Sequence, residues 1–267
     1  MWRFDAGRTA SSPHALPDNV YLQWRRTLPR PVPAWEDSLN RDLMQFDRVY
    51  EPVVMGKALF LGSSHSNALL ALDTETGEEK WAHHVDGPVR LPPVAGENRV
   101  YFTSDDGHLY CLDAETGQRI WTFMGGPADR KVLGNSRLIS TWSARGGPVL
   151  KDGTIYFGAG MWPFMGSFIH AIDAETGRTE WTNGGSGSLY MLQPHNSPAY
   201  GGVGPQGALV VADDRLLTPG GRSVPACYDR ATGDYIYYHF ARYNKTGGAF
   251  VAARDSLVFN YHRGGIT

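Results

Sequence analysis

The sequence predicts an all-β fold, a β-propeller built from four-stranded antiparallel blades. The main observation is an internal repeat, Asp-x-x-Thr-Gly-x-x-x-aromatic, which occurs at residues 73–81, 113–121, 173–181 and 229–237. A second observation is the composition: 32 Gly, 17 Pro, 8 Trp and 13 Tyr are typical of short strands joined by tight turns. Turn signals also divide each repeat into four short apolar stretches, and radial repetition of four-stranded units forms a propeller.

Each copy of the repeat combines a tight turn with an aromatic side chain that docks on the next blade. Asp can accept hydrogen bonds from backbone N–H groups two residues on, and Gly adopts the positive φ that closes a short hairpin. The Trp four residues after Gly is expected to bury roughly 150–250 Å². In the last copy Tyr replaces Trp, which predicts a weaker contact. We assign the docking role to Asp73, Gly77, Trp81, Asp113, Gly117, Trp121, Asp173, Gly177, Trp181, Asp229, Gly233 and Tyr237.

In chain order, residues 1–48 precede the first complete repeat and are expected to form a leader strand and a linker. Residues 20–28 alternate as a strand does, and their Trp24 resembles the end of a repeat. The blades are expected at 49–86, 87–124, 125–183 and 184–240, and residues 241–267 begin a further blade. The chain is therefore predicted to be a single partial propeller.

The third and fourth blades carry long insertions. The repeat Asp residues lie 40, 60 and 56 residues apart, and the extra residues fall mainly in 125–145 and 184–204, where they are expected to emerge as loops. Arg and Trp on such loops suit an anionic or sugar-like ligand, through bidentate hydrogen bonds and stacking. Alternatively, the loops pack on one another as ordinary surface loops do. The candidate ligand-facing residues are Arg130, Arg145, Trp162, His195 and Arg222.

Charge, hydropathy and cysteine content argue against nucleic-acid binding, a membrane span and a disulfide. With 25 Lys and Arg against 27 Asp and Glu, the net charge of −2 gives no electrostatic reason to expect nucleic-acid binding. No apolar run reaches the roughly 18 residues of a membrane span, so we expect no transmembrane segment. The chain also begins without an apolar export signal. Cys111 and Cys227 replace the small Ala of other repeats, which favours packed thiols over a disulfide.

The pattern Ala-x-Asp-x-x-Thr-Gly-x-x-x-Trp, at 71–81 and 171–181, resembles the tryptophan-docking motif of quinoprotein-type (PQQ-like) β-propeller repeats. The opening, Trp2-Arg-Phe-Asp-Ala-Gly-Arg-Thr, resembles the leader strand of BamB-type and related bacterial envelope proteins. The resemblance covers nearly the whole chain. It implies an eight-bladed ring in the periplasm or cell envelope, of which this chain forms about half. The remaining blades or a second copy would then close the ring.

That family contains both PQQ-dependent alcohol dehydrogenases and noncatalytic assembly scaffolds. Its dehydrogenases carry a vicinal disulfide, a Trp that stacks on the quinone, and Ca²⁺ held by Glu and Asn beside a catalytic Asp. This chain has no Cys-Cys pair, and no convincing set of Glu, Asn and Asp residues can be aligned with that site. We therefore expect a noncatalytic scaffold without a cofactor, whose partners are other proteins or an anionic or sugar-like ligand. The alternatives are a fragment of a PQQ-dependent dehydrogenase, using PQQ with calcium, or the binding portion of a larger envelope enzyme.

Overall fold

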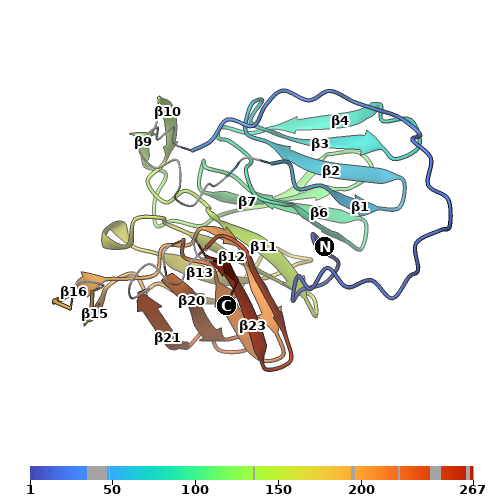
Figure 1. The fold of residues 1–267 in the computed structure, drawn as a ribbon. Coiled ribbons are helices and arrows are strands. Elements are labelled where there is room, and N and C mark those ends of the chain that lie inside the picture. The colour runs from blue at the N-terminus through green and yellow to red at the C-terminus, as the bar shows by residue number, and fades with distance from the viewer. Residues whose placement is uncertain are drawn as a thin grey trace.

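The computed structural model describes residues 1–34, 47, 49–134, 136–193, 196–221, 223–240, 248–262 and 265–266. Within these ranges the chain forms β-strands and a single 3₁₀ helix, η1 (Pro163–Met165). Four-stranded antiparallel sheets follow one another in chain order, from the blue strands at the upper right of Figure 1 to the red strands below. The predicted fold class, an all-β propeller of four-stranded blades, is confirmed.

We number the four-stranded sheets as blades one to four. Blade one contains β1 (Val53–Met55), β2 (Ala58–Ser63), β3 (Ala68–Asp73) and β4 (Glu79–His84). Blade two contains β5 (Val94–Gly96), β6 (Arg99–Thr103), β7 (His108–Asp113) and β8 (Arg119–Met124). Blade three contains β11 (Gly146–Lys151), β12 (Thr154–Ala159), β13 (Phe168–Asp173) and β14 (Thr179–Asn183). Blade four contains β18 (Val210–Ala212), β19 (Arg215–Thr218), β20 (Ser223–Asp229) and β21 (Tyr235–Phe240).

The other strands extend or decorate these blades. A short strand, β17 (Gly207–Ala208), pairs in parallel with β11. A three-stranded sheet follows blade four and contains β22 (Val251–Arg254), β23 (Leu257–His262) and β24 (Gly265–Ile266). The insertions before blades three and four each fold into a two-stranded hairpin. These hairpins are β9 (Lys131–Gly134) with β10 (Arg137–Ser140), and β15 (Leu189–Leu192) with β16 (Pro198–Gly201).

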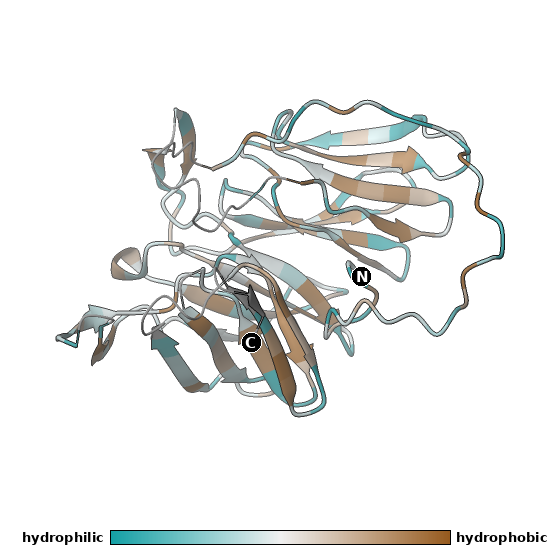
Figure 2. Ribbon diagram, viewed as in Figure 1, coloured by the Kyte–Doolittle hydropathy of each residue, from teal (hydrophilic) through white to brown (hydrophobic). Residues whose placement is uncertain are grey.

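The third strand of a blade is buried on both faces because it lies between two neighbouring blades. In β7, Leu109 and Cys111 pack with residues of blade three, whereas Tyr110 and Leu112 pack with residues of blade one. Figure 2 shows hydrophobic residues running along the strands of these sheets. The apolar sequence of the third strand therefore follows from its place in the stack.

The repeat turn fixes the end of each third strand. Asp73 Oδ1 accepts hydrogen bonds from the backbone N–H of Glu75 at 2.8 Å and of Thr76 at 3.0 Å. These bonds stabilise the carboxylate and lower the pKa of Asp73. Gly77 then adopts a φ of 73°, a conformation that costs Gly little and other residues more. The turn recurs at Asp113, Asp173 and Asp229, which accept equivalent bonds.

The beginning of the chain packs against the innermost strands of the later blades. The backbone carbonyl of Ala6 accepts from Val211 at 3.0 Å, and that of Gly7 accepts from Ala253 at 2.8 Å. Arg8 is buried beside them and donates to the carbonyl of Leu209 at 2.8 Å. This segment thus joins blade four to the sheet that follows it. Within the described ranges, no helix has the length and apolar character needed to cross a bilayer.

Candidate functional site

A cluster of buried charges lies where the chain enters the innermost strands. Arg90, Arg145 and Gln206 occupy equivalent positions in blades two, three and four. Each lies four residues before a valine of the first strand, namely Val94, Val149 or Val210. These three valines occupy equivalent pairing positions in their blades. The repeat therefore brings these three side chains to the same end of the sheets.

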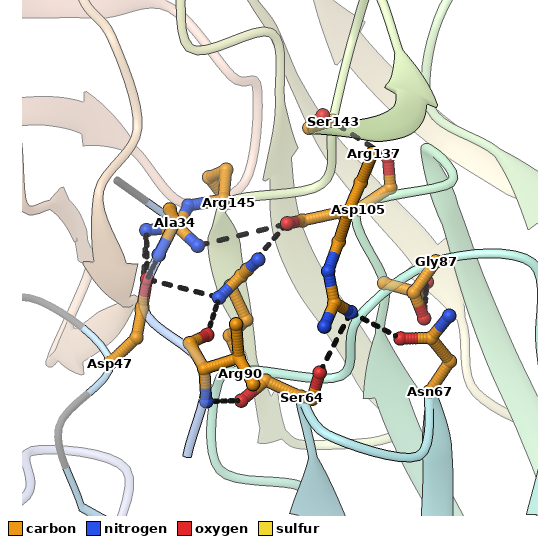
Figure 3. Close-up of polar contacts among 12 residues, drawn as sticks. Ala34, Asp47, Ser64, Asn67, Gly87, Arg90, Asp105, Arg137, Ser143 and Arg145 are labelled. Atoms are coloured by element: carbon orange, nitrogen blue, oxygen red, sulfur yellow. Dashed lines mark hydrogen bonds and ion pairs between the residues drawn. The ribbon is translucent and has the colours of Figure 1, made fainter. Parts of the chain in front are cut away.

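Two carboxylates neutralise the arginines of this cluster. Arg145 Nη2 lies 3.0 Å from Asp47 Oδ2, and Arg145 Nη1 lies 3.7 Å from Asp105 Oδ1. Arg90 Nη1 lies 3.6 Å from Asp47 Oδ2, and Arg90 Nε donates to Asp105. Gln206 Oε1 completes the cluster by accepting from Arg145 Nη2 at 3.1 Å. Figure 3 shows both arginines between the two aspartates.

The charges are almost completely removed from water. At most 5% of the side-chain surface is exposed in Arg90, Arg145, Asp47 and Asp105. Burial by itself lowers the pKa of Arg145, but the charges of Asp47 and Asp105 outweigh it, and the pKa of Arg145 is raised. The guanidinium of Arg145 thus stays charged, and both arginines are paired with carboxylates. Such a cluster fixes the relative positions of the segments that carry it.

Further hydrogen bonds extend the cluster to blade one. Arg137, on β10, donates to the backbone carbonyl of Ser64 and to Asn67 Oδ1, each at 3.0 Å. The backbone carbonyl of Asp105 accepts from Ser143 Oγ at 3.1 Å. Both connections are visible in Figure 3. Val32 accepts from Arg90 through its carbonyl and donates its N–H to Ser64 Oγ, so the network reaches from the β2–β3 turn of blade one to the entrance of blade four.

The candidate ligand-facing residues do not share one environment in the structure. Arg145 is buried in the charge cluster, in contrast to the ligand-facing position expected from the sequence. Arg130 is exposed and precedes β9, and Trp162 is half-buried and precedes η1. His195 and Arg222 lie outside the described residues. His170, on β13, is buried, and its Nε2 lies 2.9 Å from Gly125 O.

The insertions instead expose large apolar side chains. Leu133 and Leu138 lie directly opposite each other on β9 and β10 and are 77% and 64% exposed. Tyr190 and Tyr200 are opposite each other on β15 and β16, are 65% and 75% exposed, and have ring centroids 5.2 Å apart. Phe164 of η1 is 82% exposed. We call these five residues the insertion surface. Figure 1 shows both hairpins projecting from the left side of the molecule.

The insertions are attached firmly to the blades. Besides the hydrogen bonds of Arg137, Ile139 is buried on the opposite strand face from Leu138. Trp142 Nε1 donates to the carbonyl of Met165 at 2.8 Å, which holds η1 in place. Met191 packs on the core between blades three and four. The insertion surface is therefore presented by anchored elements.

Sequence reasoning placed the insertions but missed their exposed apolar pairs. A usable signal was present, because residues 131–140 contain two apolar stretches on either side of a polar turn. That pattern is typical of a hairpin with one face turned to solvent.

The comparisons with known proteins agree with the β-propeller fold observed in the structure. The family model that matches the chain is described as outer membrane protein assembly factor BamB, and it covers residues 22–160. BamB of Bordetella pertussis is 28% identical over 197 residues, which cover 69% of this chain and 46% of that protein.

Quinone-dependent enzymes are also similar to the chain. The dehydrogenase subunit of the quinone alcohol dehydrogenase of Gluconobacter oxydans is 28% identical over 142 residues, which cover 49% of this chain and 18% of that protein. The solved structure of a europium-containing methanol dehydrogenase superimposes with a TM-score of 0.55 at 16% identity and covers 86% of this chain. The chain spans half or less of the length of each of these proteins.

The dehydrogenase relatives raise the question of whether this chain could hold a quinone with calcium. Calcium prefers several carboxylate and carbonyl oxygens. At the inner-strand end, the carboxylates of Asp47 and Asp105 are already paired with Arg90 and Arg145. No group of three or more His, Cys, Asp or Glu residues within the described ranges could hold a metal ion. The described part of the cluster suits ion pairing between blades and does not fit a calcium-bound quinone.

Proposed function

The chain belongs to the BamB family of PQQ-like β-propellers, and from this premise we propose that it is a noncatalytic scaffold that binds another protein in the bacterial cell envelope. Its site of action would be the periplasm or the envelope, where its binding surface would face a partner. The family relation supports both points, since the matching model describes an assembly factor.

The insertion surface is the single observation that carries this proposal. Exposed aromatic and leucine side chains are costly to leave in water, and clusters of them mark interaction sites. Tyr is enriched among the residues that contribute most to protein interfaces. The hairpins are anchored by Arg137 and by Met191, so little conformational entropy would be lost when a partner binds.

Site-specific photo-crosslinking in the bacterial host tests the proposal. A photoreactive phenylalanine analogue at Leu138 or at Tyr200 should give the same single adduct with one envelope protein. Leu257 is the matched control, because it is 60% exposed but lies at the β22–β23 turn, away from the hairpins. Different adducts at the two test positions, or the same adduct at Leu257, would contradict a shared binding surface.

A binding measurement then gives the size of the effect. With the crosslinked protein purified, the double change Leu138→Asp and Tyr190→Asp should weaken binding by at least about tenfold, because both substitutions place charge in an apolar interface. Both side chains are more than 60% exposed, so the variant should keep the stability of the parent chain.

The similarity to the quinone alcohol dehydrogenase subunit supports a second candidate, the binding portion of a larger PQQ-dependent enzyme. This candidate predicts that incubation with PQQ and Ca²⁺ leaves a quinone absorbance on the protein after gel filtration. It also predicts dye reduction in the presence of alcohols. The scaffold function predicts that both signals are absent and that the crosslinks described above are observed.

A further inference from the structure

The three seams between blades one to four have equivalent residues on each side. The second strand of a blade begins with Ala58, Arg99 or Thr154, each of which pairs with the repeat Asp of its own blade. On the next blade, the residue after the repeat Asp is Ala114, Ala174 or Arg230. The three seams can therefore be compared at the same place.

A guanidinium group bridges two of these seams. Between blades two and three, Arg99 Nη1 donates to the backbone carbonyl of Ala174 at 3.2 Å and to that of Glu175. Between blades three and four, the guanidinium comes from the opposite side, because Arg230 Nη1 lies 2.8 Å from Asp152 Oδ2. Each of these seams is thus closed by an arginine at one of the two equivalent positions.

At the seam between blades one and two, both positions hold alanine, and a pocket takes the place of the arginine. Ala58 corresponds to Arg99 and Ala114 corresponds to Arg230, and both alanines are buried. They line a pocket of about 350 Å³ together with Phe60. We call this space the seam pocket.

The backbone acceptors that bind Arg99 have counterparts in the seam pocket. Ala174 and Glu175 are the first two residues after the Asp of their repeat turn, and Ala114 and Glu115 are the same two residues of the preceding turn. The two turns are held by equivalent hydrogen bonds, and Ala114 and Glu115 both line the pocket. The carbonyl pair that Arg99 binds is therefore repeated at the seam pocket.

The first carbonyl of this pair can accept a further hydrogen bond. Ala174 O accepts two, from Arg99 Nη1 at 3.2 Å and from Tyr101 Oη at 3.0 Å. Ala114 O accepts from Trp81 Nε1 at 3.2 Å, its one hydrogen bond among the described residues. Because a carbonyl oxygen has two lone pairs, Ala114 O has capacity for a second donor.

The charges around the seam pocket are compatible with a cation. Lys57 and Lys80 line the pocket, but both lie beside carboxylates of their own blade. Lys57 Nζ is 3.0 Å from Glu75 Oε1, and Lys80 Nζ is 4.0 Å from Asp73 Oδ2. Glu115 adds a third carboxylate, so the negative charges outnumber the positive ones.

We propose that the seam pocket binds an alkylguanidinium group, the chemistry of an arginine side chain. A guanidinium presents several N–H donors in one plane and is more weakly hydrated than an ammonium group, so it suits a pair of carbonyls beside an aromatic ring. Met55 and Phe60 provide apolar surface for the carbon stem.

The seam pocket is remote from the insertion surface. It lies at the repeat-turn end of the blades, whereas Arg137 of the β9–β10 hairpin contacts the β2–β3 turn at the other end. The inference therefore does not rest on the scaffold function, and loss of the hairpin crosslinks would leave it unchanged.

Nuclear magnetic resonance titration of the intact chain with three butyl compounds tests the head group. Butylguanidinium should shift the indole N–H resonance of Trp81 and the backbone amide of Glu115 in a saturable manner. Butylammonium should bind at least about tenfold more weakly, and butyrate should shift neither resonance. Absence of saturable shifts, equal binding of butylammonium, or tighter binding of butyrate through Lys57 and Lys80 would overturn the proposal.

Ala58→Arg places the side chain of Arg99 in the seam pocket. It should abolish the shifts caused by butylguanidinium and raise the urea midpoint of unfolding. Leu257→Arg is the matched control, because it adds the same charge at the exposed β22–β23 turn and should leave the titration unchanged. Full butylguanidinium binding by folded Ala58→Arg would overturn the proposal.

Arg99→Ala supplies a reverse test that does not depend on the folding of Ala58→Arg. The change empties the equivalent place between blades two and three, so butylguanidinium should now shift the indole resonance of Trp121 as well. In the parent chain that resonance should not move. A folded Arg99→Ala variant without the second site would show that the carbonyl pair does not recognise guanidinium, and would overturn the proposal.

A peptide distinguishes the two sources of the guanidinium group. Acetyl-Gly-Arg-Gly-amide that binds at least about tenfold more tightly than butylguanidinium would assign the seam pocket to an arginine of another protein. Equal affinities would assign it to a free guanidinium compound. Both results support a guanidinium site, whereas a peptide with Lys in place of Arg that binds equally well would contradict it.

Discussion

The indole N–H of Trp121 is buried without a hydrogen-bond acceptor in the described structure. Trp81 donates the equivalent N–H to the backbone carbonyl that follows the next repeat Asp, at 3.2 Å. For Trp121 that acceptor is Ala174 O, but it already accepts from Tyr101 Oη at 3.0 Å and Arg99 Nη1 at 3.2 Å. Residues outside the repeat motif therefore decide whether the docking indole keeps its hydrogen bond.

Glu51 makes the stability of the folded chain depend on pH, and this dependence can be measured. Burial raises the pKa of Glu51 to about 7 from an ordinary value of 4.5, although Arg8 opposes the shift. Between these two pH values the folded chain holds a proton that the unfolded chain releases. The contribution of Glu51 to stability is thus greatest below pH 4.5 and falls as the pH rises to 7.

Replacing Glu51 with Gln should therefore stabilise the chain at high pH. We expect Glu51→Gln to match the parent chain near pH 4.5 and to exceed its free energy of unfolding by more than about 1 kcal/mol at pH 8. Urea unfolding at the two pH values measures this difference. The exposed Glu78→Gln serves as the control and should change neither value. A variant that is less stable than the parent at pH 8 would show that the attraction between the charges of Glu51 and Arg8 outweighs burial.

At the scale of the element, the repeat turn depends on space as well as on backbone conformation. Gly117 and Gly153 have similar φ values of 71° and 78°. A Cβ at Gly117 would lie 2.6 Å from the Trp81 ring, whereas nothing lies within 4 Å of a Cβ at Gly153. The two positions therefore separate the cost of the conformation from the cost of the contact.

Gly153→Ala should cost only the left-handed backbone penalty, about 1–2 kcal/mol. Gly117→Ala should cost about 1–3 kcal/mol more, because the added methyl group displaces Trp81 from the seam. Urea unfolding of the two variants, together with near-ultraviolet circular dichroism of the tryptophans, checks both values. Equal losses of stability would mean that the seam relaxes around the extra methyl group.

The elements predicted best from the sequence are those that the repeat specifies. The four copies of the motif predict the turns and the doubly buried third strands, because both features are local or recur with the period. The insertions follow no period, so 125–145 and 184–204 were read only as loops, while the structure forms a two-stranded hairpin within each. Arg145 looked like a ligand residue because its partners, Asp47 and Asp105, lie 98 and 40 positions away in the sequence.

At the scale of the whole molecule, the charge cluster makes the blades depend on one another. Repeat proteins usually gain stability from contacts between nearest neighbours. Here Asp105 of blade two binds Arg145 of blade three, which in turn binds Gln206 at the entrance to blade four. Through Val32, whose carbonyl accepts from Arg90 and whose N–H donates to Ser64 Oγ at 2.8 Å, the same network reaches blade one. Loss of one buried charge should therefore lower the stability of other blades as well as that of its own blade.

Arg145→Met tests this dependence. The change leaves Asp47 and Asp105 with an uncompensated buried charge, for which we expect a loss of about 3–5 kcal/mol in the free energy of unfolding. Hydrogen exchange should accelerate in β3 and β20 as well as in β12, because all four blades share the cluster. Arg230→Met is the control: this arginine pairs with Asp152 at 2.8 Å on an exposed turn, and its removal should cost about 0–1 kcal/mol. Acceleration confined to blade three would show that the blades open independently, and the cluster would then be only a local contact.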